Sequence, residues 1–401
     1  MRRLLLALFA VPLAVAFAPA QSPDPAKLAA ITARMQKFAD DGELAGAVTV
    51  VGRKAGTLHH DAVGFRSLED RTPMTKDSVF RIASMTKPVA AIAVMILADQ
   101  GKLSPDDPME KHLPEFKGQL LVTGRDGETL TLKKPKRPVT VRDVMTHTSG
   151  LSGSYGPGFA DAWTTRPWTL AETTIAVASR PLEFEPGSRW AYCNTGIDSL
   201  GRLVEKVSGR RFEDFCRDRI FAPLGMWDTT FHPSPEQLAR TAVTYGLDKS
   251  NRLTPAPGLL IEYHPGARHP VPMGGLFSTG GDLAHLYRMM LNKGTLNGRR
   301  VLSEKAVAEM TRVQTGDLRT GFVDGMGFGY GWAVVREPKG VTGMLTAGTF
   351  GHGGAFGTQG WADPTQDLFC VLLIQRTGIP NGDASPYRHA LQGLAVDALK
   401  P

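Results

Sequence analysis

The sequence predicts an α/β (α+β) protein in which strands from both ends of the chain build one antiparallel sheet flanked by helices, and the middle forms a mainly helical region. Three observations support this fold class. Two β-prone runs lie near the N-terminus, four short ones lie in the last hundred residues, and helical patterns dominate between them. With 401 residues, of which 42% are hydrophobic and 21% charged, the chain can form one large domain or two closely packed ones.

The first twenty residues are typical of a secretory signal peptide. Arg2 and Arg3 precede an apolar run over residues 4–16, and residues 18–20 have the small-x-small form that signal peptidase cuts. We therefore expect an exported protein, periplasmic or secreted after cleavage near Ala20, with an uncleaved N-terminal anchor as the alternative. Removing residues 1–20 takes away two positive charges and no negative ones, so the net charge of +7 becomes +5. No later stretch is apolar for long enough to cross a bilayer, so we expect no stable membrane span after cleavage.

The first half of the mature chain alternates between clear helix and strand patterns. Residues 25–40 predict a helix with an apolar residue every three or four positions, residues 46–52 predict a strand, and a second strand runs up to Gly64. Residues 84–100 are almost uniformly apolar after Lys87, which indicates a helix buried on all sides and ended by Gly101. Residues 118–138 alternate around two glycines and predict a hairpin-like insertion.

The second half ends in a predicted antiparallel meander. A helix begins at Asn194 or Thr195, either of which can cap it, and Gly209 closes it; residues 282–291 predict another helix. Residues 329–335, 344–351, 357–362 and 368–374 predict four strands, and residues 386–399 predict a closing helix. We expect one domain over residues 21–398. Its sheet part comprises about 25–80 and 297–398, and its mainly helical part about 81–296.

A nucleophile with a neighbouring base is the first chemical signal. Ser84 and Lys87 form the only S-x-x-K in the chain, and residues three apart share one face of a helix. Serine needs an adjacent base to become nucleophilic, and burial can lower the pKa of a lysine enough for it to serve as one. The backbone N–H groups at a helix N-terminus can also face a developing oxyanion. Alone, however, this tetrad occurs by chance in most chains of this size.

Two further motifs have structural explanations when each is considered alone. Tyr192-Cys193-Asn194 is the only Y-x-N, and it can equally be a packing aromatic followed by a helix cap. His352-Gly353-Gly354 lies between two predicted strands and can be a simple β-turn. Its glycines would also let a ligand approach the backbone closely.

Together, in this order and spacing, the three motifs resemble the serine β-lactamase and penicillin-binding protein family, especially its class C-like branch. Segments 143–151, 223–229 and 274–282 add to the resemblance, which covers residues 25–398. The resemblance implies a sheet domain beside a helical domain, with the active site between them. It implies Ser84 as nucleophile, Lys87 and Tyr192 as the groups that move its proton, and Asn194 as a substrate-binding residue. The N–H groups of Ser84 and Ala355 would form the oxyanion hole.

The third motif departs from the K-T-G that is usual in β-lactamases and D,D-peptidases. Histidine is mostly neutral at pH 7, so His352 is a weaker anchor for a substrate carboxylate than lysine. With Gly353 and Gly354, it would bind substrate as part of an esterase-like site. We therefore expect hydrolysis of carboxylic esters or other small acyl substrates. A β-lactamase or D-alanyl carboxypeptidase/D-aminopeptidase acting on a peptidoglycan-derived peptide is the alternative, and a non-turnover penicillin-binding sensor or scaffold is the third.

Other residue patterns argue against further classes of function. The histidines show no H-E-x-x-H spacing and the glycines no G-x-G-x-x-G, so we expect no metal and no cofactor. The tight basic cluster at residues 133–137 lacks interleaved aromatics and predicts a solvated loop, not a nucleic-acid partner. His147 is expected to be structural, bonded near a helix end. Three cysteines indicate no disulfide framework but leave one bridge open.

Overall fold

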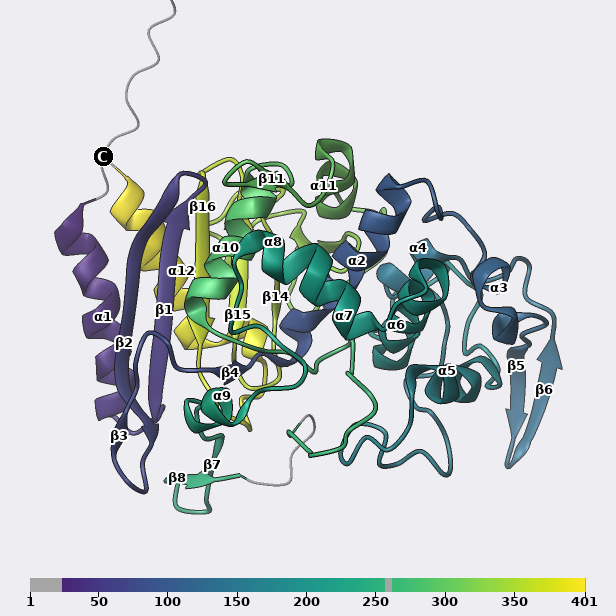
Figure 1. The fold of residues 1–401 in the computed structure, drawn as a ribbon, viewed down its shortest axis with the longest axis horizontal. Coiled ribbons are helices and arrows are strands. Elements are labelled where there is room, and N and C mark those ends of the chain that lie inside the picture. The colour runs from purple at the N-terminus through teal and green to yellow at the C-terminus, as the bar shows by residue number, and fades with distance from the viewer. Residues whose placement is uncertain (1–23, 257–261, 401) are drawn as a thin grey trace, which may run out of the picture.

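Strands from both ends of the chain pair into one sheet in the computed structural model, which describes residues 24–256 and 262–400. The eight strands are antiparallel and lie in the order β12-β13-β14-β15-β16-β1-β2-β3 (Figure 1). They comprise β1 (Gly46–Arg53), β2 (Gly56–Ser67), β3 (Thr72–Pro73), β12 (Met326–Phe328), β13 (Ala333–Val335), β14 (Phe350–Gly353), β15 (Gln359–Asp363) and β16 (Leu368–Leu373). The predicted antiparallel sheet flanked by helices is confirmed. The predicted signal peptide lies outside the described residues.

Both faces of this sheet are buried. In β16, Phe369, Val371 and Leu373 belong to the larger hydrophobic core, while the alternate residues 368, 370 and 372 belong to a smaller one. Successive side chains of a strand point to opposite faces, so each face has its own core. Helices α1 (Pro25–Asp40) and α12 (Pro386–Leu399) cover the smaller core, and α10 (Gly280–Leu291) packs on the other face (Figure 1).

The middle of the chain is mainly helical and lies beside the sheet, on the side of α10 (Figure 1). Its central helix is α2 (Lys87–Asp99), in which every residue from Lys87 to Leu97 is buried. The remaining helices are α3 (Met109–His112), α4 (Val141–Met145), α5 (Leu170–Ala178), α6 (Asn194–Ser208), α7 (Phe212–Cys216), α8 (Ala222–Leu224), α9 (Pro235–Ala239) and α11 (Glu304–Thr311). One hydrophobic core continues from the sheet into this region, so the two parts are packed together.

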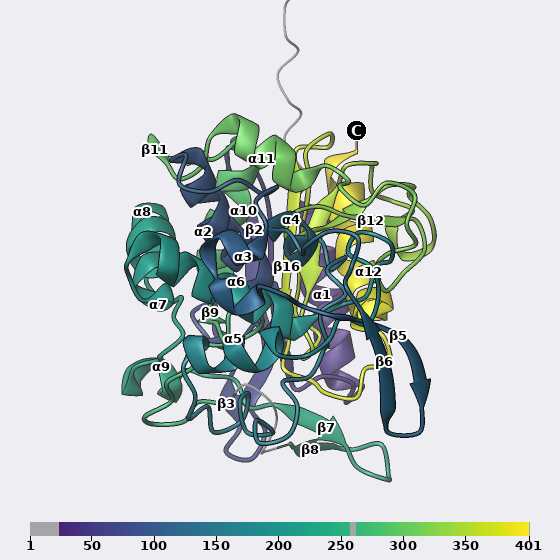
Figure 2. The same ribbon diagram turned by 90° about the vertical axis from the view of Figure 1, so that its right-hand side faces the viewer.

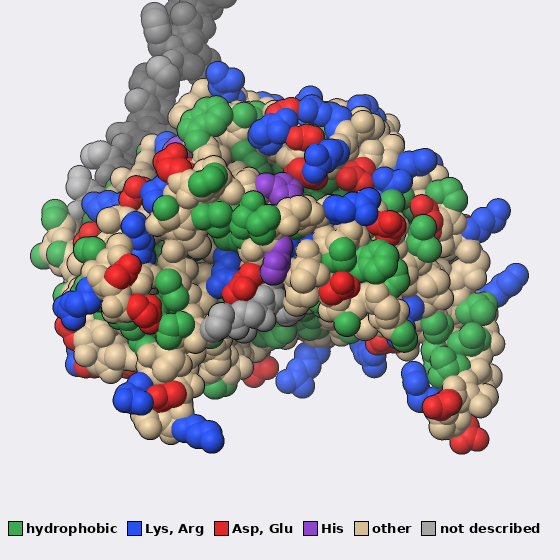
Figure 3. All heavy atoms as spheres, turned by 60° about the horizontal axis from the view of Figure 1, so that its bottom comes forward, with side chains coloured by type: hydrophobic (Ala, Val, Ile, Leu, Met, Phe, Trp, Pro, Cys, Tyr) green, Lys and Arg blue, Asp and Glu red, His purple; other side chains and the backbone are tan. Residues whose placement is uncertain are grey.

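Four two-stranded ribbons complete the fold. They are β4 (Phe80–Arg81) with β9 (Phe277–Ser278), β5 (Leu121–Asp126) with β6 (Thr129–Lys133), β7 (Tyr245–Leu247) with β8 (Leu253–Pro255), and β10 (Thr295–Leu296) with β11 (Arg299–Arg300). The β5–β6 hairpin falls within segment 118–138 and projects from the helical region (Figure 2). On the face shown in Figure 3, Lys and Arg side chains alternate with acidic ones and form no single basic patch.

Two of the predicted strands are shorter than the sequence pattern suggests. Residues 329–335 form a turn followed by β13, because the N–H of Gly329 donates to the Trp332 carbonyl and Gly331 adopts a φ of 74°. A side chain at Gly331 would overlap Ala91 of α2, so the bend lets the chain approach that helix closely. Residues 344–349 likewise form turns, and β14 begins only at Phe350.

The described residues show two further features that bear on the sequence analysis. All three cysteines, Cys193, Cys216 and Cys370, are buried and free, so the bridge left open above does not form. Across residues 24–256 and 262–400, no helix has both the length and the apolar character that crossing a membrane requires.

Candidate active site

Ser84 lies on the tight helical turn Ala83–Thr86 that leads directly into α2. Ser84 and Lys87 therefore share one face of a continuous helical segment. The Lys87 Nζ atom lies 3.0 Å from the Ser84 Oγ atom. Ala83, just before the serine, has a φ of 46°, a left-handed conformation that is costly for a residue other than glycine and is concentrated at functional sites. The structure thus brings the serine hydroxyl and the lysine amine within hydrogen-bond distance.

Lys87 is completely buried beneath the serine. Its Nζ atom also donates to the carbonyl of Met273, at 2.7 Å. Burial lowers the pKa of Lys87 from 10.5 to about 7, because the charged form loses its hydration, while the carboxylate of Asp198 acts in the opposite direction. A substantial fraction of Lys87 is therefore neutral near pH 7 and able to accept a proton.

Tyr192 packs against both members of this pair. The Lys87 Nζ atom lies 4.7 Å from the centroid of the Tyr192 ring. Burial raises the pKa of Tyr192 well above its usual value, and a hydrogen bond with the Ser84 side chain acts in the opposite direction. Because the phenol is protonated at neutral pH, it can take up a proton only as it passes its own on. Ser84, Lys87 and Tyr192 are thus close enough to exchange protons.

His147 holds the segment that carries Tyr192. The N–H of Ala191 donates to the His147 carbonyl at 2.9 Å, and the N–H of Cys193 donates to its Nδ1 atom at 3.1 Å. The imidazole also packs on the Tyr192 ring, with 4.5 Å between the ring centroids. His147 itself has a φ of 60° and is buried, and burial lowers its pKa well below the usual value. It is a neutral positioning residue, bonded near the end of α4.

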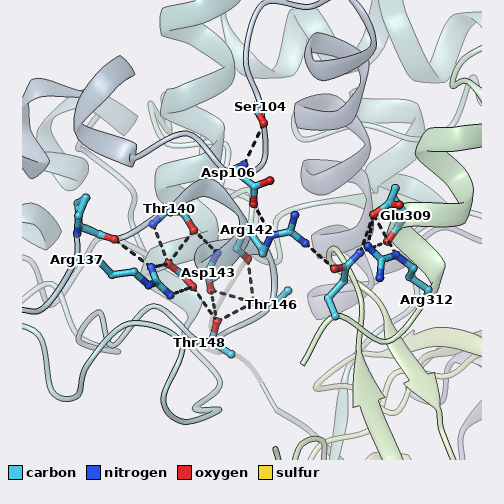
Figure 4. A network of polar contacts seen from close by, with 12 residues as sticks. Ser104, Asp106, Arg137, Thr140, Arg142, Asp143, Thr146, Thr148, Glu309 and Arg312 are labelled. Atoms are coloured by element: carbon cyan, nitrogen blue, oxygen red, sulfur yellow. Dashed lines mark hydrogen bonds and ion pairs between the residues drawn. The ribbon is translucent and has the colours of Figure 1, made fainter. Parts of the chain in front are cut away.

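A polar network anchors α4, and with it His147. Asp143 caps the first turn of α4 together with Thr140 and accepts two hydrogen bonds from Arg137 (Figure 4). On the other side of α4, Arg142 donates to Gln314, which follows α11, at 2.6 Å. Through the bond between Arg142 and Gln314, the network ties α4 to the segment that follows α11.

Asn194 is the first residue of α6, and this corrects the expectation that it or Thr195 caps the helix. The capping position is Cys193, which makes no side-chain cap bond. The Asn194 side chain lines the same pocket as Ser84, and its buried Oδ1 atom has no hydrogen-bond partner in the structure. A buried polar atom normally requires a partner, so this amide is placed to bind a substrate group. Gly209, with a φ of 71°, ends the helix as predicted.

His352 lies near the end of β14, and its ring centroid is 6.1 Å from that of Tyr192. Its Nδ1 atom lies 2.7 Å from the Gly353 carbonyl, and its buried Nε2 atom has no partner. Burial, followed by the nearby charge of Lys87, lowers the pKa of His352 from 6.5 to about 4. The imidazole is therefore neutral at pH 7, and its unpartnered nitrogen is available to a substrate.

Gly353 and Gly354 allow β14 to pack tightly beside the serine. A Cβ atom on Gly354 would overlap the hydroxyl of Thr358 and the carbonyl of Ile82, two residues before Ser84. The Thr358 hydroxyl itself donates to the Ile82 carbonyl at 3.1 Å. A Cβ atom on Gly353 would overlap the Asp383 carboxylate. Ala355 follows this glycine pair and lines the same pocket as Ser84.

A pocket of about 410 Å³ joins these elements, and we call it the Ser84 pocket. The predicted site residues on its wall are Ser84, Tyr192, Asn194, His352, Gly353, Gly354 and Ala355. Lys87 lies below the pocket floor. Every predicted site residue is therefore in the pocket wall or directly beneath it.

The same wall contains residues that sequence reasoning missed. They are Phe322, Pro380, Asn381, Gly382 and Asp383. Met273 and Asp198, which adjust the position and pKa of Lys87, were missed as well. No motif marks these residues, because they come from loops and helices far from Ser84 in the sequence. No group of three or more His, Cys, Asp or Glu residues in the described part of the chain could hold a metal ion.

Comparison with known proteins places this chain in a class of serine hydrolases. The model of the β-lactamase family matches residues 31–394, and the chain belongs to this family. Esterase EstB of Burkholderia gladioli is 32% identical over 398 residues, covering 92% of this chain and 96% of that protein. An uncharacterised protein of Mycobacterium tuberculosis strain CDC 1551 is 34% identical over 366 residues, covering 86% of this chain and 88% of the relative. Penicillin-binding protein 4 of Amycolatopsis lactamdurans is 32% identical over 307 residues, which cover 76% of this chain and 73% of that protein.

Solved structures agree with this assignment. EstCE1, described as a hydrolase with promiscuous acyltransferase activity, superposes with a TM-score of 0.77 at 25% identity, covering 93% of this chain and 98% of its own. Simvastatin synthase from Aspergillus terreus has the same fold, with a TM-score of 0.76 at 22% identity and coverage of 93% and 97%. The protein is thus a serine β-lactamase-fold hydrolase with esterase and acyltransferase relatives.

Proposed function

We propose that this protein is an exported esterase that cleaves small carboxylic esters through a covalent acyl-enzyme on Ser84. The observation that carries the proposal is the 3.0 Å contact between the Ser84 hydroxyl and a Lys87 amine whose pKa burial lowers to about 7. A neutral amine in this position provides the adjacent base that a serine nucleophile needs.

Acylation begins when the Ser84 oxygen attacks the ester carbonyl carbon. The hydroxyl proton passes to Lys87, directly or through the Tyr192 hydroxyl, and the carbonyl becomes a tetrahedral oxyanion. The N–H groups of Ser84 and Ala355 donate to this oxyanion, and Asn194 binds the acyl side of the substrate. Collapse breaks the bond to the alcohol oxygen, which takes up the proton from the Lys87–Tyr192 pair and leaves.

Deacylation repeats the same chemistry with water. The Lys87–Tyr192 pair accepts a proton as water attacks the acyl carbon, and the second oxyanion collapses to release the carboxylic acid. Ser84 recovers its proton from the pair. Because the Lys87 Nζ atom lies against the Tyr192 ring and both residues are next to Ser84, the base is assigned to the pair.

Two features favour esters over β-lactams and D-alanyl peptides. β-Lactams and D-alanyl peptides carry a carboxylate. The third motif, which would bind that carboxylate, has a neutral histidine, His352, in place of a lysine. Among the relatives, Esterase EstB matches over nearly the full length of both chains. A small neutral ester needs no cationic anchor and makes full use of the oxyanion hole.

The test is stopped-flow hydrolysis of p-nitrophenyl acetate and p-nitrophenyl butyrate by the purified mature chain. We expect a p-nitrophenol burst that matches the enzyme concentration, and a Ser84→Ala variant that shows neither burst nor turnover. Ser250→Ala, which changes an exposed serine away from the pocket, is the matched control and should behave as the wild type. Intact mass after rapid acid quench should show one acyl group on the wild type only. Background rates in the wild type would contradict the proposal.

A parallel assay with nitrocefin, a D-alanyl-D-alanine peptide and a fluorescent penicillin tests the alternative functions. Nitrocefin or peptide turnover faster than ester turnover would identify a β-lactamase or a D-alanyl carboxypeptidase/D-aminopeptidase. A stable penicillin adduct without turnover of any substrate would identify a penicillin-binding sensor.

Export is tested separately by expressing the full chain and determining the N-terminus of the protein outside the cytoplasm. We expect residue 21 as the first residue. Retention in the cytoplasm with an intact N-terminus would contradict export while leaving the chemistry at Ser84 untouched.

A further inference from the structure

Asp383 is the one Asp, Glu, Lys or Arg among the described residues that line the Ser84 pocket. It lies in the turn Gly382–Ala384, which connects the last strand of the sheet to α12. The rest of the wall consists of neutral polar, aromatic, glycine, proline and alanine residues. The one charged side chain in such a wall influences which substrate charges the pocket accepts.

The Asp383 carboxylate forms no ion pair with a Lys or Arg in the described part of the chain, although its charge acts on the buried Arg388 and raises the pKa of that guanidinium against the effect of burial. Its Oδ1 atom accepts a hydrogen bond from the neutral amide of Gln359 at 3.1 Å, and its own N–H donates to Asn381. Arg388 is buried nearby, but its guanidinium donates to the Asp383 backbone carbonyl at 2.8 Å and not to the carboxylate. The carboxylate is thus held in position while its charge is left without an ion pair.

The position of this charge is close to the reacting groups. Gly353 leaves no room for a side chain, because a Cβ atom there would overlap the Asp383 Oδ1 atom. The Asp383 charge also acts on the pocket residues Tyr192 and His352: it adds to the effect of burial that raises the pKa of Tyr192, and it partly opposes the burial that lowers the pKa of His352. His352 remains neutral at pH 7, so no fixed positive charge on the pocket wall offsets the carboxylate.

We propose that Asp383 selects esters whose alcohol carries a cationic ammonium group and disfavours those whose alcohol carries a carboxylate. This inference rests on the proposed function, which places the acyl side of the substrate at Asn194. Asp383 lies next to Gly353 and His352 at the end of β14, and with the acyl side at Asn194 we assign this end of the pocket to the leaving alcohol. The ammonium gains Coulomb attraction in a partly desolvated wall, and an anionic alcohol meets repulsion there and no compensating cation.

A matched pair of substrates isolates the charge. Acetylcholine and 3,3-dimethylbutyl acetate share the acetyl group and nearly the same alcohol shape, but only the first is cationic. Carboxymethyl acetate supplies the anionic case. We expect the wild type to show a kcat/KM for acetylcholine about tenfold above that for 3,3-dimethylbutyl acetate at low salt, with the anionic ester slowest. Raising the salt concentration should reduce the ratio, because ions screen the charge.

The variant Asp383→Asn keeps the side-chain size and should bring the acetylcholine to 3,3-dimethylbutyl acetate ratio close to one. Asp126→Asn, which removes an exposed negative charge from the distant β5–β6 hairpin, controls for net charge and should keep the wild-type ratio. A wild-type ratio near one, or an unchanged ratio in Asp383→Asn, overturns this inference while ester turnover still supports the proposed function. No Ser84-dependent turnover of any of the three esters or of p-nitrophenyl acetate overturns both.

Discussion

Asp198 and Lys87 hold Met273 from opposite sides. The Asp198 Oδ1 atom accepts the Met273 N–H at 2.8 Å, and the Met273 carbonyl accepts from the Lys87 Nζ atom at 2.7 Å. The Asp198 carboxylate is itself buried and bonded to Tyr155 and Trp163. One buried anion therefore both positions the backbone group that binds Lys87 and counteracts the effect of burial on its pKa.

The first prediction concerns the pH profile of Asp198→Asn. Neutral Lys87 is the active form, so kcat/KM of the wild type should rise with pH around the Lys87 pKa of about 7. Asp198 raises that pKa, so neutralising it should move the midpoint to lower pH. The neighbouring His147 and His352 have lowered pKa values and are neutral in this range.

The measurement is kcat/KM for p-nitrophenyl acetate between pH 5 and pH 9. Tyr155→Phe is the matched control, because it removes a bond to Asp198 but keeps the carboxylate. A midpoint that stays in place in Asp198→Asn, or that moves equally in Tyr155→Phe, would show that Asp198 has only a structural role.

The second prediction concerns Lys87→Arg. Guanidinium stays protonated in proteins, so this variant keeps the charge and reach but loses the base. We expect kcat/KM to fall about a thousandfold, within the range typical of losing a general base. Burst amplitude and rate with p-nitrophenyl acetate measure the loss. If activity persists in Lys87→Arg and disappears in Tyr192→Phe, the tyrosine alone is the base.

The third prediction concerns stability in Lys87→Met. The folded-state pKa of about 7 lies below the usual 10.5, so between these values the unfolded chain binds a proton that the folded chain does not. The free energy of unfolding therefore decreases as pH falls from about 10.5 to 7, and the full cost persists below pH 7. Removing the amine should raise Tm by about 3 °C or more at pH 6, with the gain shrinking toward pH 10.

Thermal unfolding by circular dichroism at pH 6, 8 and 10 measures this difference. Lys102→Met, at an exposed position just after α2, is the control and should show no gain that depends on pH. A Tm difference between Lys87→Met and wild type that is constant with pH would mean that Lys87 is not neutral in the folded protein.

The fourth prediction concerns the glycine pair at the end of β14. Gly354→Ala should place a methyl group against Thr358 and the Ile82 carbonyl, two residues before the nucleophile. We expect a lower Tm and a fall of about tenfold or more in kcat/KM, because small displacements at a reacting centre are costly. Gly153→Ala, which meets nothing within 4 Å, should leave both unchanged. Equal effects of the two substitutions would contradict this packing role.

The helices and strands that were predicted correctly are those whose signals lie close together in the sequence. The helices at residues 25–40 and 386–399 have the predicted bounds, because a capping side chain, a proline in the first turn and an apolar period are all encoded nearby. Of the strand predicted over residues 329–335 only Ala333–Val335 forms, because short apolar runs rich in glycine do not distinguish a strand from a bend. The predicted cap at Asn194 or Thr195 was wrong, because Cys193 occupies the capping position and Asn194 lines the pocket.

Local sequence is enough to pair Ser84 with Lys87, since a spacing of three residues on a helical turn sets that contact. It also predicts strands at both ends of the chain and a histidine, His352, in the third motif. The surroundings of these residues depend on the tertiary fold. Asp198 and Asp383 reach the site from α6 and from the turn before α12, and such long-range contacts leave no periodicity or spacing in the sequence. Packing buries Lys87 and brings these two carboxylates to the site, and so determines the pKa of the base and the charge of the pocket.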